Sequence, residues 1–211
     1  MPSRLPALIF DFGNVIAFFD YTRIGAALGK NLGLSGEEFL EQARTLGFTP
    51  LLQRYESGQL SSEEFGRAVC SLLNFEMSHP EFAAIWADIF WLNPPVAKLV
   101  RELKGLGYTL VLGSNTNAMH ADHYRQQFAE ELSPFDRLVM SHDIGHIKPS
   151  AAFYLACASA AGADPGDCIF IDDLSENVAG AKAAGLRGLL FRDEPSLRVD
   201  LASLGIELPE A

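Results

Sequence analysis

Cysteines, basic residues and long hydrophobic runs are all scarce in this chain of 211 residues. Its three cysteines are odd in number, form no Cys-x-x-Cys pair and lie among apolar neighbours, so we expect buried, reduced thiols typical of a reducing compartment. No stretch approaches the ~18 apolar residues of a membrane span. Asp11 interrupts the first apolar run too early for a secretory leader. We therefore expect a cytoplasmic protein with no membrane partner.

Lysine and arginine total 16 against 27 aspartates and glutamates, which gives a formal net charge of −11 at pH 7. This acidic balance, without any basic run, argues against nucleic acid or an anionic membrane surface as a partner. Apolar residues make up 48% and charged residues 20% of the chain, which excludes disorder and coiled coil as the main architecture. The length suits one generous domain, or a core with a smaller insertion. No feature of the sequence indicates an oligomeric state.

Five short apolar runs predict strands that are buried on both faces, because most of the runs are continuous rather than alternating. The runs cover residues 7–10, 108–112, 137–140, 168–171 and 188–191. Helices are predicted between the later runs, starting near Asn93, Ser150 and Ser175 and ending at Gly107, Gly162 and Gly185. Strands that alternate with helices predict an α/β fold with a parallel sheet covered on both sides.

The segment 17–93 carries no strand signal, and its pattern predicts helices throughout. Ser35 and Ser61 each precede a glutamate by three residues, the spacing of a capping box at a helix start. A further helix is predicted from Pro80, with Phe82, Ile85, Trp86, Ile89 and Phe90 on one face.

We expect this segment to form a small helical domain inserted into an α/β core made of residues 1–16 and 94–211. The aromatic residues Phe82, Trp86, Phe90 and Trp91 are expected in the interior of the inserted domain rather than on a substrate or dimer surface.

Polar residues follow the predicted strands at the points where ligands bind in open parallel sheets. Asp11 ends the first run, Ser114-Asn115 follows the second, Lys148 follows the third, and Asp172-Asp173 follows the fourth. Each has a simpler explanation when taken alone: a turn, a loop opening, a surface lysine or a helix cap. Because these residues occur in this order, each after a predicted apolar strand, we expect them to line a single crevice.

Three carboxylates in one crevice could not all stay ionised unaided at neutral pH. Lys148 can supply one positive charge, and Mg²⁺, which prefers oxygen ligands, can supply two. A carboxylate at a strand end can attack phosphorus to form an aspartyl phosphate, while Ser114 holds phosphate oxygens. The residues therefore predict a site for phosphoryl transfer.

These residues and their order closely resemble the haloacid-dehalogenase-like (HAD) superfamily over nearly the whole chain. The resemblance implies a Rossmann-like parallel sheet core with an inserted helical cap, residues 17–93, that closes over the site. It implies that Asp11 is the nucleophile and that Lys148 orients it together with the phosphate. It also implies a phosphate-binding set of Ser114, Asn115 and Lys148, and a Mg²⁺ site formed by Asp11, the Gly13 carbonyl, Asp172 and Asp173.

Within the implied cap, the segment Arg54-Tyr55-Glu56-Ser57-Gly58-Gln59-Leu60-Ser61 resembles a familiar cap signature. The same residues are explained equally well as the end of one helix and the start of the next. The sequence therefore leaves open whether this segment contacts the substrate.

One position departs from the superfamily pattern. Its phosphatases usually carry a second aspartate two residues after the nucleophile as general acid and base, and here that position is Gly13. Such help is worth roughly 10²–10⁴ in rate. The segment 11–15, Asp-Phe-Gly-Asn-Val, nonetheless resembles a bacterial subgroup that includes α-D-glucose-1-phosphate phosphatase. Asp20, His120 or a water could supply the missing proton.

We therefore predict a Mg²⁺-dependent hydrolase of a small phosphorylated metabolite, with sugar phosphates favoured, acting through an aspartyl phosphate on Asp11. One alternative is a 2-haloacid dehalogenase, which also uses a strand-end aspartate and lacks the second one. That class needs no metal, so it leaves Asp172-Asp173 unexplained. The other alternative is a non-catalytic protein that binds a phosphorylated ligand.

Overall fold

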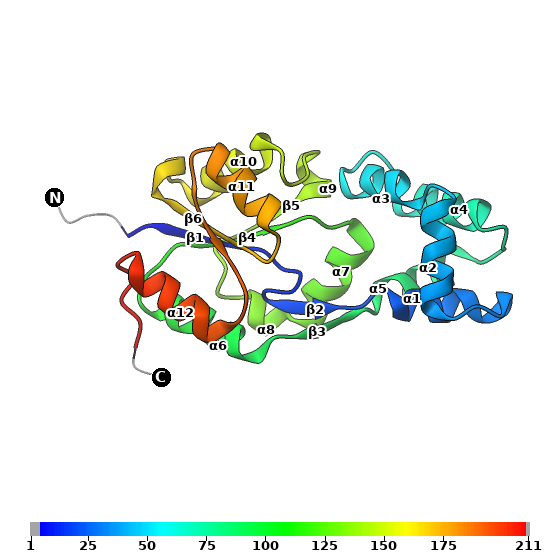
Figure 1. The fold of residues 1–211 in the computed structure, drawn as a ribbon, viewed down its shortest axis with the longest axis horizontal. Helices are drawn as coiled ribbons and strands as arrows, with labels where there is room; N and C mark the ends of the chain where they lie inside the picture. Colours follow the sequence, from blue (N-terminus) through cyan, green and yellow to red (C-terminus); the bar gives the residue numbers. More distant parts are fainter. Residues whose placement is uncertain (1–4, 210–211) are drawn as a thin grey trace.

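The computed structural model describes residues 5–209, so the ends of the expected core, residues 1–4 and 210–211, lie outside the described residues. Five parallel strands form the central sheet, and their topology confirms the predicted α/β fold (Figure 1). In spatial order the strands are β5 (Arg137–Met140), β4 (Leu110–Ser114), β1 (Ala7–Phe10), β6 (Cys168–Asp172) and β7 (Arg187–Leu190).

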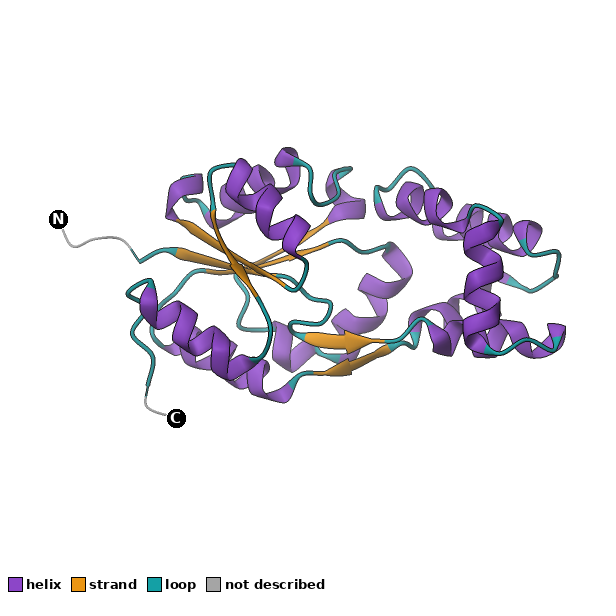
Figure 2. Ribbon diagram, viewed as in Figure 1, coloured by secondary structure: helices purple, strands orange, loops and turns teal. Residues whose placement is uncertain are grey.

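Helices cover both faces of this sheet (Figure 2). One face carries α6 (Pro94–Gly105), α7 (Ala118–Gln127), α8 (Ala129–Leu132) and α12 (Glu194–Ser203). The other carries α9 (Ser141–Ile144), α10 (Ala151–Ala161), the 3₁₀ turn η2 (Pro165–Asp167) and α11 (Ser175–Ala183). The central strand β1 is buried on both sides, because Leu8 and Phe10 pack into the first layer while Ile9 packs into the second.

The predicted strands are confirmed, although β4 begins later than its apolar run. The helix before it ends in a left-handed turn, with Gly107 at φ +87°. The Tyr108 N–H then donates to the Leu103 carbonyl at 3.2 Å. Tyr108 is therefore held by the helix end, and the strand starts only at Leu110.

The inserted segment contains α1 (Thr22–Gly29), the 3₁₀ turn η1 (Lys30–Leu32), α2 (Gly36–Thr45), α3 (Phe48–Glu56), α4 (Ser62–Leu72) and α5 (His79–Ala87). These helices gather at one end of the molecule, beyond α7 and α9 (Figure 1). The capping boxes predicted at Ser35 and Ser61 are both present. A third, between Ser78 and Glu81, starts α5. Local sequence signals therefore set where these helices begin.

The prediction of helices throughout this segment is wrong at its two ends. Strands β2 (Ala17–Phe19) and β3 (Phe90–Leu92) pair antiparallel and connect the sheet to the helices (Figure 2). Helix α5 ends at Ala87, so Phe90 reaches the interior from a strand rather than from a helix. Alternation along β3 turns Trp91 outward against Phe18, with 46% of the tryptophan exposed, so its predicted place in the interior is also wrong.

Trp86 joins the inserted helices to the core. Its indole stacks on the His120 ring of α7 at 5.2 Å and packs edge-on against Phe65 at 4.8 Å. Its Nε1–H donates to Asn117 Oδ1 at 3.2 Å. Apolar packing and one buried hydrogen bond thus make a continuous interior from the insertion to the sheet.

Cys157 and Cys168 are buried, as predicted, whereas Cys70 is partly exposed. Over residues 5–209, every helix is too short to cross a lipid bilayer.

The close approach of α1 and α2 gives a test of this packing. A Cβ atom added at Gly25 would fall well inside van der Waals contact with the Gly36 carbonyl oxygen. We expect Gly25→Ala to lower the free energy of unfolding by about 1–3 kcal/mol through overpacking. Gly105→Ala is the matched control, because that helical glycine meets open space and should gain up to about 1 kcal/mol. Urea unfolding measures both, and a Gly25→Ala variant as stable as the parent would contradict the packing.

Candidate active site

The topology brings the predicted site residues to one edge of the sheet. Strand β1 lies between β4 and β6, so Asp11, Ser114 and Asp172 meet at neighbouring carboxyl ends although they are far apart in sequence. One carboxylate oxygen from each of Asp11, Asp172 and Asp173 lies within 4.8 Å of the other two. The predicted crevice with three carboxylates is therefore present.

Lys148 is buried between two of these carboxylates. Its Nζ lies 2.7 Å from Asp11 Oδ1 and 2.7 Å from Asp172 Oδ2, and only 5% of the residue is exposed. Burial disfavours the charged ammonium, but the two carboxylates outweigh that effect and raise the pKa of Lys148. Lys148 is therefore a fixed positive charge at the strand ends.

Asp11 stands in an environment that disfavours its charge. Burial raises the pKa of Asp11 to about 7, Lys148 opposes this, and the carboxylates of Asp172 and Asp173 add to it. The Phe12 N–H donates to Asp11 Oδ1 at 2.7 Å, and the same oxygen pairs with Lys148, so the plane of the carboxylate is set. A further positive charge nearby would favour the ionised form.

Asp172 and Asp173 are adjacent in sequence but differ in surroundings. Asp172 is fully buried, and besides Lys148 its carboxylate accepts hydrogen bonds from the Leu174 N–H at 2.9 Å and from Asn177 Nδ2 at 2.9 and 3.1 Å. Asp173 is partly exposed and accepts one hydrogen bond from Asn14 Nδ2 at 2.9 Å. Asp173 is thus the more available of the two to a ligand.

A cavity of about 210 Å³, here called the carboxylate cavity, opens over this cluster. It is lined by Asp11, Gly13, Asn14, Phe19, Asn115, Lys148, Asp173, Leu174 and Asn177. The two acidic side chains that line it, Asp11 and Asp173, outnumber its one lysine, and both offer oxygen atoms as ligands. That donor set suits a hard divalent cation such as Mg²⁺.

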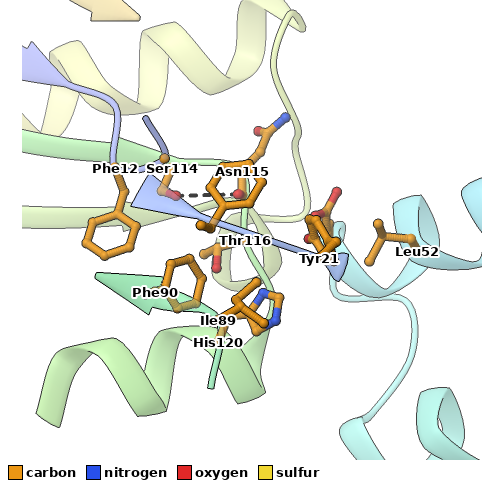
Figure 3. A pocket seen from close by; sticks show the side chains of 12 residues that line it. Phe12, Tyr21, Leu52, Ile89, Phe90, Ser114, Asn115, Thr116 and His120 are labelled. Atoms are coloured by element: carbon orange, nitrogen blue, oxygen red, sulfur yellow. Dashed lines mark hydrogen bonds between the residues drawn. The ribbon is translucent and has the colours of Figure 1, made fainter. Parts of the chain in front are cut away.

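A second cavity of about 240 Å³, the cap-side cavity, lies between the strand ends and the inserted helices (Figure 3). It is lined by Phe12, Gly13, Phe19, Tyr21, Leu52, Glu56, Ile89, Phe90, Ser114, Asn115, Thr116 and His120. Gly13, Phe19 and Asn115 border both cavities. The two spaces therefore adjoin one another at the position where a phosphatase would carry its second aspartate.

Ser114 and Asn115 differ in what their side chains do. The Ser114 hydroxyl makes a long 3.4 Å contact with the Asn115 carbonyl and faces the cap-side cavity (Figure 3). Asn115 Oδ1 accepts the Lys148 N–H at 2.8 Å, and Asn115 Nδ2 donates to the Lys148 carbonyl at 3.2 Å. The Asn115 amide thus holds the lysine loop against β4, which sequence reasoning did not foresee.

Neither side chain suggested as a substitute proton donor is suited to that role. Asp20 accepts hydrogen bonds from the Thr22 N–H and hydroxyl at 2.8 and 2.7 Å, which lower its pKa, and it borders neither cavity. His120 faces the cap-side cavity, but its Nε2 bonds to the Trp86 carbonyl at 2.8 Å and its Nδ1 to Asn117 Nδ2 at 3.0 Å. Burial lowers the pKa of His120 to about 3, so the ring is neutral at pH 7.

Comparison with known proteins identifies the family. The model of the haloacid dehalogenase-like hydrolases matches residues 5–185. The chain belongs to the haloacid dehalogenase-like hydrolase family. Both the predicted superfamily and the predicted fold are thereby confirmed.

Three individual proteins are similar to this chain at 28%, 22% and 18% sequence identity. A D-ribitol-5-phosphate phosphatase of Bacteroides thetaiotaomicron is 28% identical over 186 residues, which are 84% of this chain and 87% of that protein. The structure of a HAD-family enzyme of the same bacterium, in complex with magnesium and inorganic phosphate, has a TM-score of 0.75 at 22% identity and covers 92% of this chain and 99% of its own. An L-2-haloacid dehalogenase of Xanthobacter autotrophicus has a TM-score of 0.65 at 18% identity, covering 95% and 83%. The fold by itself therefore does not decide between phosphatase and dehalogenase activity.

The neutral state of His120 predicts a specific loss of stability in acid. The unfolded chain takes up a proton near pH 6.5, whereas the folded ring resists protonation to about pH 3, so the free energy of unfolding falls as the pH drops below 6.5. Between pH 7 and 5 this single group should account for about 2 kcal/mol. Urea unfolding at pH 7 and at pH 5 measures this effect. Between the two pH values, the free energy of unfolding should fall by about 2 kcal/mol less in His120→Gln than in the parent. The exposed His146→Gln is the control, and equal pH dependence in the parent and His120→Gln would contradict the assignment.

Proposed function

We propose that this hydrolase is a Mg²⁺-dependent phosphatase that cleaves a small phosphate monoester through an aspartyl phosphate on Asp11. The observation that carries the proposal is the buried Lys148, held between Asp11 and Asp172 while Asp173 stays open to the carboxylate cavity. A D-ribitol-5-phosphate phosphatase among its relatives, and a similar structure with magnesium and phosphate, support the same chemistry.

In this mechanism Asp11 attacks phosphorus from a fixed position. The Lys148 ammonium favours the ionised form of Asp11 and offsets negative charge on the phosphoryl oxygens. Ser114, at the border of the cap-side cavity, donates its hydroxyl hydrogen bond to the phosphate. Asp172 orients Lys148, so we assign it to positioning rather than to direct metal ligation.

The residues fit a bound Mg²⁺ ion, because three carboxylates face a single lysine and every donor is an oxygen. Asp11, Asp173 and the Gly13 carbonyl would hold the ion. It would supply positive charge beside the phosphate and favour ionised Asp11. The hydrogen bond from Asn14 Nδ2 orients Asp173 for this role.

The cap-side cavity suits a small polar metabolite with an apolar side. Apolar groups of Tyr21, Leu52 and Phe90 and polar groups of Ser114 and Thr116 line it together. We propose that residues 17–93 act as a cap that selects the leaving alcohol. Sugar or polyol phosphates are the favoured substrate class, because one relative is a D-ribitol-5-phosphate phosphatase.

A 2-haloacid dehalogenase is the second candidate, since an enzyme of that activity shares the fold. The charge of the site disfavours it. Asp173 adds a third carboxylate that a metal-free dehalogenase does not require, and it would repel the carboxylate of a haloacid. Its availability to a cation favours phosphate chemistry instead.

Phosphate release tests the proposed function directly. The protein with Mg²⁺ should hydrolyse p-nitrophenyl phosphate, and Asp11→Asn should lose roughly 10³-fold or more of kcat because the nucleophile is gone. Asp20→Asn is the control, since Asp20 borders neither cavity and the asparagine oxygen can accept the same hydrogen bond from the Thr22 N–H. Chloride release from 2-chloropropionate in the presence of a chelator, without phosphate release, would support the dehalogenase instead.

Metal binding can be measured without turnover. We expect Mg²⁺ at about 100 times its dissociation constant to add roughly 2.7 kcal/mol to the free energy of unfolding of the parent and of Asp20→Asn. Asp173→Asn should lose this increment, because it removes a ligand without filling the cavity. Thermal unfolding with Mg²⁺ and with a chelator measures the difference. An unchanged increment in Asp173→Asn would refute the assigned metal site.

A further inference from the structure

At the position where phosphatases of this superfamily usually carry the acid and base aspartate, this chain has Gly13, which offers no side chain. Glu56, the last residue of α3, borders the cap-side cavity together with Gly13 and Ser114. Among the described residues that line this cavity, Glu56 carries the one carboxyl group. Asp11 and Asp173 line the adjoining carboxylate cavity. An acid from the insertion therefore faces the space next to the proposed nucleophile.

Contacts on both sides of Glu56 fix its position against the core. The preceding Tyr55 stacks on Phe65 at 4.3 Å, and its hydroxyl accepts the Met119 N–H of α7 at 3.1 Å. Two residues after Glu56, Gly58 has φ +70°, and a Cβ there would collide with the His142 carbonyl of α9. The chain is thus held at α7 and at α9, and the carboxyl group is placed between these contacts.

The surroundings of Glu56 keep a proton available near neutral pH. Burial raises the pKa of Glu56 to about 7, and the nearby Lys148 ammonium opposes this. Among the described residues that line the same cavity, the other titratable groups are the Tyr21 phenol, whose pKa is raised by burial, and the His120 ring, which is neutral at pH 7. Glu56 is therefore balanced between its acid and its carboxylate, as a group that both gives and takes a proton must be.

We infer that Glu56 is the general acid and base that replaces the carboxyl group absent at Gly13. This assignment rests on the proposed phosphatase function. As the Asp11 carboxylate forms its bond to phosphorus, the bond from phosphorus to the ester oxygen breaks, and the Glu56 carboxyl proton passes to that oxygen to release a neutral alcohol. The Glu56 carboxylate then takes a proton from water. The resulting hydroxide bonds to phosphorus, the acyl phosphate bond breaks, and inorganic phosphate, Asp11 carboxylate and protonated Glu56 are regenerated.

The dependence of the rate on the leaving group tests this role. An alkyl phosphate such as ribitol 5-phosphate expels a poor leaving group that needs the proton, whereas p-nitrophenolate leaves with little help. For Glu56→Gln we expect kcat/KM to fall about 10²–10⁴-fold on the alkyl ester and to change less than about 3-fold on the aryl ester. Because kcat/KM covers only the steps through departure of the alcohol, the later base role does not enter the comparison.

Matched variants control for structural effects. Glu63→Gln alters an exposed glutamate of α4 that pairs with Arg67 on the surface, and should leave kcat/KM on both esters unchanged. Glu56→Asp keeps the acid but shortens it, and should recover part of the rate on the alkyl ester alone. The aryl activity of each variant reports that Asp11 and the fold are intact.

The outcomes separate this inference from the proposed function. A parent enzyme that hydrolyses both esters, with a Glu56→Gln variant that loses equally on both or on neither, overturns the role of Glu56 alone. A parent enzyme that releases phosphate from neither ester in the presence of Mg²⁺ overturns the proposed function and this inference with it.

Discussion

The ammonium of Lys148, buried between Asp11 and Asp172, is the interaction on which the rest of the site depends. Removing such charges from water costs several kcal/mol for each ion, and only close pairing with further hydrogen bonds offsets that cost. The protein provides both. Asn115 binds the backbone of Lys148 at two points, and Asn177 binds Asp172, so the lysine and its partner are each held from a second side. The ammonium thereby favours the ionised form of the Asp11 carboxylate, which burial disfavours.

The adjacent residues Asp172 and Asp173 differ in their contacts. Asp172 accepts hydrogen bonds from Asn177 and pairs with Lys148, whereas Asp173 is oriented by Asn14 and stays open to the carboxylate cavity. Three carboxylates and one ammonium leave the site with surplus negative charge. A divalent cation would balance that charge, so the electrostatics favour the proposed metal-dependent phosphatase over a dehalogenase.

The inferred role of Glu56 would give the insertion a part in the chemistry. Trp86 packs on His120 and bonds to Asn117, and this buried contact joins the two parts. Burial of the ring lowers the pKa of His120, although the hydrogen bond with the Trp86 carbonyl opposes this. The contacts of Tyr55 and Gly58 with α7 and α9 place Glu56 beside the strand ends. Nucleophile and proton donor would then come from different parts of the chain, so cleavage of a poor leaving group would require the insertion to be in contact with the core.

The sequence by itself determined the α/β core, the starts of α2 and α4, and the order of acids and lysine along the strand ends. These features are encoded locally, because continuous apolar runs, capping boxes and strand-end polar residues are visible within a few positions. Strands β2 and β3 could not be read this way, since each has three residues and pairs with a segment at the far end of the insertion. The outward turn of Trp91, the different surroundings of Asp172 and Asp173, and the proximity of Glu56 to the site were decided only by the tertiary structure. The burial, charge pairing and pKa of a side chain depend on which residues surround it in space. Many of those surrounding residues lie far from it along the chain, so the local sequence does not reveal them.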